Sequence, residues 1–134
     1  MLCSTTRRFI DRRAVRRYYI VKTIEKYIEV MLNKDYKGVN DLFNDNGSYN
    51  DYCPAISQKQ SEYHIFGREA IEMFLRNKFA FYQYGIQSAR IISDSEAAFI
   101  SNLGGYYIKA VAKIEEFDAD GAEGKIFKLV VRPR

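Results

Sequence analysis

The residues from Tyr27 to Asp51 could bring a phenol and a carboxylate together. The pattern predicts that Tyr27 lies on an amphipathic helix and that Asp51 lies near the end of a short strand. Burial in an apolar pocket raises the pKa of a carboxylate, and a phenol can donate a hydrogen bond to a developing oxyanion. If both side chains reach one pocket, they could transfer a proton on a small molecule.

Alternation along the expected strand places Tyr49, Asp51 and Cys53 on one face and Tyr52 on the other. Each of the two chemical candidates also has an ordinary explanation. Asp51 could cap a turn or face water, and Tyr27 could be a core aromatic whose hydroxyl finds a local partner. The sequence leaves both alternatives open.

His64 and the strand over 106–117 raise the same question of which side chains face a pocket. His64 stands just before a predicted helix, where a pocket mouth is expected, yet a lone histidine there is also typical of the surface. Along 106–117, small apolar residues alternate with charged ones. Either the apolar face meets the core, or the charged face lines the pocket and the apolar face forms a dimer interface. Since Lys and Glu are seldom buried without partners, the first arrangement is favoured.

The composition argues against several classes of protein. The 134 residues suit one domain, 47% are hydrophobic, and no apolar run is long enough to span a bilayer. The first residues lack the apolar segment of a secretory signal, so we expect a cytoplasmic protein. Two cysteines and one histidine are too few for a thiolate or multi-histidine metal site, and no nucleotide-binding motif is present. We therefore expect neither a metal nor a cofactor.

Positive charge is concentrated at the N-terminus. Residues 1–22 carry a net charge of +6, and the remaining 112 residues carry −2. We treat 1–17 as a basic arm or helix extension and 18–134 as the domain. An arginine-rich arm can bind phosphates, but a solvated helix extension gives the same count, so nucleic acid is not the expected partner.

The periodicity predicts an α+β domain. Helical spacing covers residues 20–32, a short helix covers 36–43, and a third helix follows Gly67. A turn over 44–48 precedes a strand over 48–53, and residues 54–64 are expected to be irregular. Strand-like stretches then follow over 86–92, 97–103, 106–117 and 125–132, with a Gly104–Gly105 hairpin turn. Such an order favours an antiparallel sheet that curls against the helices.

Three phrases of the chain resemble the nuclear transport factor 2-like superfamily, in particular its ketosteroid isomerases and SnoaL-like polyketide cyclases. The phrases are YIEVMLNKDYKGVNDLFNDNGSYND, FGREAIEMFL and FDADGAEGKIFKLVVRP. The resemblance covers about residues 18–132. It implies a cone-shaped, cystatin-like fold in which a curved sheet and N-terminal helices enclose an apolar cavity. It also implies a homodimer formed through the convex face of the sheet.

The resemblance also implies roles for individual residues. A helix tyrosine that donates to the enolate oxygen corresponds to Tyr27, and the base that shuttles the proton corresponds to Asp51. A second acid of the isomerases falls on Lys113, which departs from their pattern but could hold an enolate or a carboxylate. We therefore expect Asp51 and Tyr27 to be catalytic, and Tyr49, His64 and Lys113 to contact the ligand.

The resulting hypothesis is a domain that binds a small apolar or aromatic molecule and works as a cofactor-free isomerase, cyclase or dehydratase. The alternative is a non-catalytic binding or dimerisation module of the same fold, because a fold does not fix function.

Overall fold

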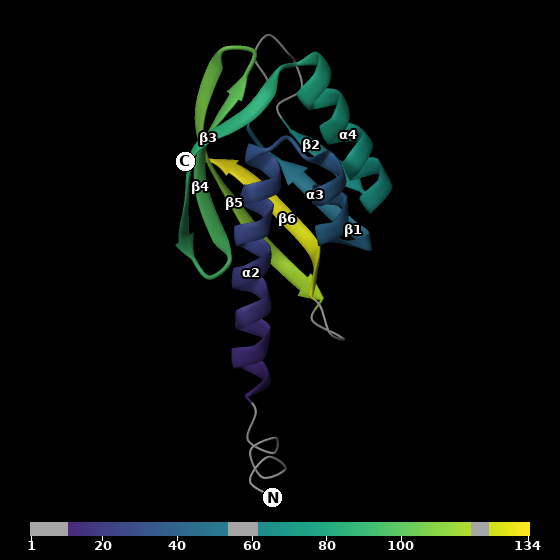
Figure 1. Ribbon diagram of the computed structural model, residues 1–134, viewed down its shortest axis with the longest axis vertical. Helices are drawn as coiled ribbons and strands as arrows, with labels where there is room; N and C mark the ends of the chain where they lie inside the picture. Colours follow the sequence, from purple (N-terminus) through teal and green to yellow (C-terminus); the bar gives the residue numbers. More distant parts are fainter. Residues whose placement is uncertain (1–10, 54–61, 119–123) are drawn as a thin grey trace, which may run out of the picture.

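The computed structural model describes residues 11–53, 62–118 and 124–134. These form three helices and six strands (Figure 1). The helices are α2 (Arg12–Leu32), α3 (Tyr36–Leu42) and α4 (Arg68–Phe81). The strands are β1 (Phe43–Asp51), β2 (Tyr63–Phe66), β3 (Tyr84–Ser93), β4 (Glu96–Leu103), β5 (Tyr106–Asp118) and β6 (Lys125–Pro133).

The six strands form one curved sheet in the order β2-β1-β6-β5-β4-β3. β1 and β6 run parallel, and the other neighbouring pairs are antiparallel. The helices cover one face of the sheet, with α2 against β3, β4 and β5 and α4 against β1, β2 and β3 (Figure 1). The predicted α+β class, with a mixed curved sheet against helices, is confirmed.

The strand register defines two faces of the sheet. Tyr49 and Asp51 pair with Leu129 and Val131 of β6 and point toward the helices, on what we call the inner face. Their neighbour Asn50 lies on the opposite, outer face, because side chains alternate along a strand. Register therefore decides which polar residues of β1 enter the core.

Helix α2 carries part of the positive charge of the N-terminal segment. The Asp11 side chain caps it by accepting a hydrogen bond from the Arg13 amide. Its later turns bury Ile24, Tyr27 and Met31 at helical spacing, whereas its first turns are exposed and extend past the sheet (Figure 1). Among the described residues, no helix is long and apolar enough to cross a membrane.

Two predictions about the segment before α4 were wrong. β1 begins at Phe43 rather than Ser48, so most of the expected turn belongs to the strand. Polar residues are tolerated there because the strand pairs with β6 through a register shift. The backbones approach closely at Gly47, where the Cβ atom of any other residue would lie only 2.8 Å from the Ile126 carbonyl oxygen. Tyr63–Phe66, placed partly in an irregular segment, forms edge strand β2; positions 54–61 lie outside the described residues.

Candidate functional site

A buried ion pair occupies the inner face at the end of β1. Asp51 is 2% exposed, and its Oδ2 lies 3.1 Å from Nζ of Lys78 on α4, which is 8% exposed. The other carboxylate oxygen, Oδ1, accepts a 2.9 Å hydrogen bond from the Cys53 amide. Burying two charges is costly unless they are paired and hydrogen-bonded, and here both conditions hold for the carboxylate.

Three aromatic rings surround the Lys78 ammonium. Nζ lies 4.3 Å from the ring centroid of Tyr84, 5.3 Å from that of Phe74 and 5.5 Å from that of Tyr63. A desolvated cation over aromatic faces gains about 2 kcal/mol from the ring quadrupoles. The rings and Asp51 together create a position that favours a positive charge on one nitrogen.

Two buried tyrosines near the ion pair, Tyr27 and Tyr49, have hydroxyl groups that are not fully hydrogen-bonded. Tyr27 and Tyr49 are both 0% exposed, and among the described residues neither hydroxyl has a hydrogen-bond partner of normal geometry. Burial raises the pKa of Tyr27, and the neighbouring Tyr49 hydroxyl only partly offsets this rise. Since an unpartnered buried hydroxyl costs about 1–3 kcal/mol, this pair is an unusual feature of the core.

Burial also raises the pKa values of Tyr84 and Cys53. Desolvation raises the pKa of Tyr84, and Ser101 lowers it in part. Desolvation and the Asp51 charge raise the pKa of the Cys53 thiol to about 12. A thiol in this state is a poor nucleophile at neutral pH, so Cys53 helps to form the site and does not supply its chemistry.

Space near the ion pair is divided between an inner cavity and a cleft. The inner cavity, which contacts Asp51, measures about 10 Å³. The cleft measures about 240 Å³ and is lined by Tyr63, Phe74, Asn77, Lys78, Tyr82 and Leu103. Tyr63, Lys78 and Leu103 line both spaces. Lys78 therefore links the buried carboxylate to a space that could hold a small molecule, while Tyr27 and Tyr49 line neither.

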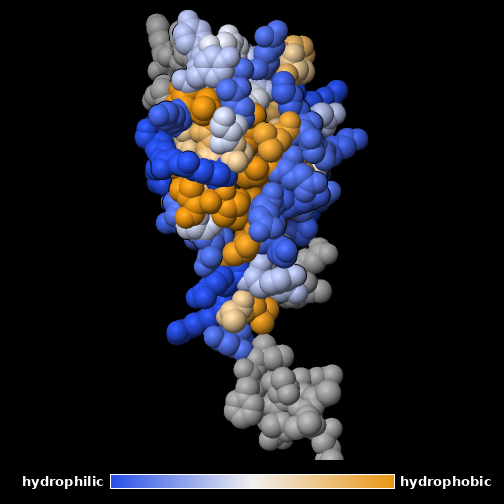
Figure 2. Space-filling model, turned by 60° about the vertical axis from the view of Figure 1, so that its left-hand side comes forward, coloured by the Kyte–Doolittle hydropathy of each residue, from blue (hydrophilic) through white to orange (hydrophobic). Residues whose placement is uncertain are grey.

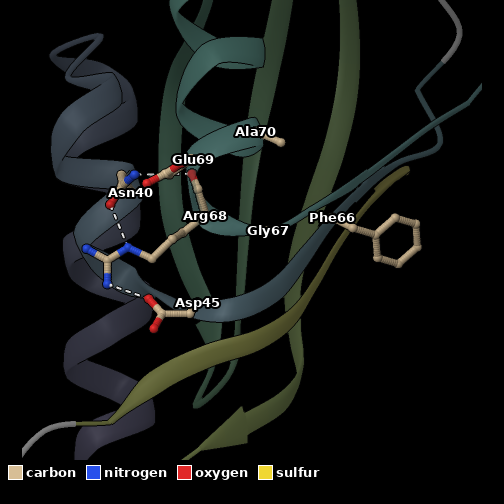
Figure 3. Close-up of a pocket in the computed structure, with 7 residues that line it drawn as sticks. All are labelled: Asn40, Asp45, Phe66, Gly67, Arg68, Glu69 and Ala70. Atoms are coloured by element: carbon tan, nitrogen blue, oxygen red, sulfur yellow. Dashed lines mark hydrogen bonds and ion pairs between the residues drawn. The ribbon is translucent and has the colours of Figure 1, made fainter.

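A larger groove of about 690 Å³ lies at the start of α4 (Figure 3). Its polar centre is Arg68, whose Nε donates to Asn40 at 2.9 Å and whose NH1 donates to Asp45 at 3.3 Å. Asn40 in turn donates to the Arg68 carbonyl oxygen at 3.2 Å, and Phe66 points away from this cluster. These bonds join α3, β1 and α4, so we assign Arg68 a structural role.

The structure brings three of the five predicted site residues together. Tyr27, Tyr49 and Asp51 lie on the inner side, and Asp51 contributes to the raised pKa of both tyrosines. Asp51 forms an ion pair with Lys78, a residue that the sequence analysis did not assign to the site.

His64 and Lys113 lie on the outer face. His64 pairs in register with Asn50, and its Nδ1 lies 2.9 Å from the Asn50 Oδ1. Lys113 is exposed and follows Ala112, which points inward with Val131. The structure thus answers the question about the 106–117 strand: its small apolar residues face the core. Neither His64 nor Lys113 reaches the space beside Asp51.

Lys78 was missed at the sequence level, although a signal for it existed. Ile71, Leu75 and Lys78 share one face of α4, so the lysine occupies the apolar stripe of the helix. A charged residue at such a position requires a partner inside the protein. Among the described residues, no three His, Cys, Asp or Glu side chains gather closely enough to hold a metal ion.

Comparisons with known proteins support the fold alone. No family model matches the chain, and no curated protein matches it. Among solved structures, a "putative ketosteroid isomerase" from Kribbella flavida is similar with 15% identity and a TM-score of 0.61, covering 87% of this chain and 78% of that one. A "putative scytalone dehydratase" from Novosphingobium aromaticivorans is similar with 13% identity and a TM-score of 0.59, covering 91% and 86%.

An "NTF-2 like protein of unknown function" from Burkholderia xenovorans is similar with 14% identity and a TM-score of 0.58, covering 88% of this chain and 84% of that one. These similarities show that the chain has the cystatin-like, nuclear transport factor 2-like fold that its sequence resembles. At such low identity they do not transfer a reaction from one protein to another.

Proposed function

We propose that this protein binds a small apolar or aromatic carbonyl compound in the cleft and transfers a proton next to the carbonyl group without a cofactor. The observation that carries the proposal is the buried Asp51–Lys78 pair, in which Asp51 lines the inner cavity and Lys78 lines both that cavity and the cleft. Titratable groups enclosed beside a ligand-sized space are typical of functional sites.

The two charged groups would have complementary roles. The Asp51 carboxylate accepts a proton from the carbon next to the carbonyl and returns it to the same or a neighbouring carbon. The Lys78 ammonium stabilises the enolate oxygen that forms in between, as a fixed positive charge at the site of developing negative charge. Tyr63, Phe74 and Tyr82 provide the apolar walls that orient the rest of the molecule.

Lys78 replaces Tyr27 as the group best placed to contact the oxyanion. Tyr27 lines neither space, whereas Lys78 lines both. In this proposal Tyr27 and Tyr49 support Asp51 from behind, because their neutral rings keep water away from it.

The size of the cleft limits the substrate. Pockets for drug-sized ligands usually measure about 300–1,000 Å³, and the cleft measures about 240 Å³. A molecule with a single ring fits these dimensions better than a steroid does.

Exchange of substrate protons with deuterated solvent tests the proposal without knowledge of the product. The wild-type protein should accelerate loss of the α-proton signals of some member of a panel of small aromatic ketones, followed by NMR. Asp51→Asn should lower that rate by about 10²- to 10⁴-fold, the usual contribution of a general base. Asp94→Asn changes an exposed carboxylate and should leave the rate unchanged. Full activity in Asp51→Asn would refute the assignment of the base.

A second candidate is a non-catalytic module that dimerises through the outer face. The small volume of the inner cavity favours it, because little free space reaches Asp51. Apolar side chains also lie on the outer face, where Ile100 and Val111 are partly exposed. Figure 2, which turns the β3–β4 side of the molecule forward, shows apolar surface bordered by charged side chains.

Sedimentation velocity separates this candidate from a monomeric enzyme. Dimerisation through the outer face predicts a dimer for the wild type and a monomer for Val111→Lys, because the new charge would be buried at the contact. Lys26→Glu, on exposed helix surface, should not change the mass. A monomeric wild type would exclude the dimer.

A further inference from the structure

Lys78 has an environment that suits a covalent role as well as an electrostatic one. Among the described residues it is the one lysine with a buried side chain. Its amine adjoins both a carboxylate, at 3.1 Å, and the open cleft. An enclosed lysine next to a proton acceptor is the arrangement from which amines attack carbonyl carbons.

The surroundings of Nζ stabilise a positive charge at one fixed position. Asp51 and the rings of Tyr84, Phe74 and Tyr63 all act on the same atom. An iminium ion formed on Lys78 would carry its charge on that same nitrogen. The groups that stabilise the ammonium would therefore stabilise the iminium, and no charge would have to move through the core.

We infer that Lys78 condenses with the carbonyl group of an aromatic aldehyde or ketone held in the cleft, forming an iminium ion. The inference rests on the proposed function, since it assigns a covalent step to the same site. Asp51 takes one proton from the ammonium, and the free amine adds to the carbonyl carbon. Asp51 then returns this proton to the carbonyl oxygen, and a second hydrogen moves from the nitrogen to the same oxygen. The oxygen leaves as water, so both hydrogens of that water come from the original ammonium. The net change converts ammonium and carbonyl into iminium and water, with no oxidation or reduction.

The iminium would make the proposed proton transfer easier. It withdraws electrons from the neighbouring carbon more strongly than a carbonyl group does, so the proton on that carbon becomes more acidic. After the condensation Asp51 is again a carboxylate and can take this proton, which leaves a neutral enamine on Lys78. Reprotonation and hydrolysis would then release the product and regenerate the amine.

Reductive trapping tests the condensation. Benzaldehyde has no α-proton, so it isolates imine formation from proton transfer. With sodium cyanoborohydride it should add the mass of the aldehyde less one oxygen, mainly to the peptide that contains Lys78. Because the cleft concentrates and orients the probe, Lys78 should be labelled at least about tenfold faster than exposed Lys113.

Matched variants make the result decisive. Lys78→Arg keeps the positive charge but cannot form the adduct, so it should lose the fast labelling; Lys113→Arg should keep it. Labelling of Lys78 no faster than that of Lys113 in the wild-type protein would overturn the inference, and this comparison does not depend on how the variants fold. If Lys78→Arg still exchanges α-protons at the wild-type rate, the iminium is excluded as an intermediate of the exchange while Asp51 remains the base. Asp51→Asn removes the base of both the condensation and the proton transfer, so the labelling of the wild-type protein by benzaldehyde, which has no α-proton, is the comparison that tests the condensation by itself.

Discussion

Neighbouring residues of β1 meet opposite conditions on the two faces of the sheet. Asn50, on the outer face, is 4% exposed and donates to the Ser48 hydroxyl and the Leu129 carbonyl oxygen, both at 3.1 Å, while its Oδ1 meets His64. Asp51, on the inner face, is enclosed together with Lys78 and with two tyrosine hydroxyls that have no hydrogen-bond partner among the described residues.

The difference separates polar residues that hold the sheet together from polar residues that are available for chemistry. On the outer face each polar group of Asn50 is satisfied by the protein, which is the usual condition of a structural residue. On the inner face a charged pair and two unsatisfied hydroxyls are kept out of water at a cost in stability. Natural proteins accept such costs mainly at functional sites.

Removal of the lysine partner should have the largest effect. In Lys78→Met, the Asp51 charge is left buried without a counter-charge, and the free energy of unfolding should fall by about 3–5 kcal/mol. Chemical denaturation measures this change. Lys113→Met, on the outer face, should alter stability by no more than about 0.5 kcal/mol.

The double variant Asp51→Asn with Lys78→Met sharpens this result. It removes both charges and should recover part of the lost stability, because no unpaired ion remains. Equal destabilisation by Lys78→Met and Lys113→Met would show that the inner pair is not a buried ion pair.

The second-largest effect should be a loss of folding stability at alkaline pH, caused by the buried titratable groups on the inner face. In the folded state the pKa of Cys53 is raised from 9.0 to about 12, and burial raises the pKa of Tyr27, Tyr49 and Tyr84. Unfolding exposes these groups, which then release protons at their ordinary pKa values, so stability falls as pH rises. The loss should begin near pH 9 and continue to about pH 12.

Denaturation midpoints measured from pH 7 to 11 would show this decline. Tyr84→Phe should make it shallower, since one titrating group is removed. Stability that stays constant to pH 11 would mean that these side chains are open to water.

Removal of a charge on the outer face, that of Glu115, should have the smallest effect on folding stability. The hydrogen bond from Arg132, 3.0 Å long, lowers the pKa of Glu115, and Lys128 adds a weaker attraction at 3.6 Å. Because the pKa of Glu115 is lowered, its ion pair stabilises the fold fully above the ordinary pKa of 4.5. This stabilisation is lost as the pH falls through the lowered pKa of the folded state.

Because Glu115 and its partners are reached by solvent, Glu115→Gln should cost no more than about 0.5 kcal/mol at neutral pH. The difference between the variant and the wild type should disappear in acid. A cost comparable to that of Lys78→Met would remove the distinction between the two faces.

Much of the fold could be predicted from the sequence. The apolar spacing of Ile24, Tyr27 and Met31 placed the main helix, and the four later strands followed from their alternation and from the Gly104–Gly105 turn. Edge strand β2 and the early start of β1 were missed. Both are polar stretches whose strand structure comes from pairing with distant segments, and a local pattern carries no signal of that pairing.

The candidate site was predicted in part. The alternation of β1 correctly grouped Tyr49 with Asp51, but no local pattern could show that the 240 Å³ cleft lies beside Lys78 rather than beside Tyr27. His64 was assigned to the site by its position before a predicted helix and Lys113 by the family resemblance, and the register of the sheet put both on the other face.

The sequence by itself determined most of the elements and the shared face of Tyr49 and Asp51, because the periods of 3.6 and 2 residues are local properties of the backbone. Only the tertiary structure decided that Lys78 approaches Asp51 across 27 positions of the chain and that three rings enclose its charge. The physical reason is that the partner of a buried charge is selected by the packing of α4 against the sheet, and the energy of that pair depends on how completely water is excluded.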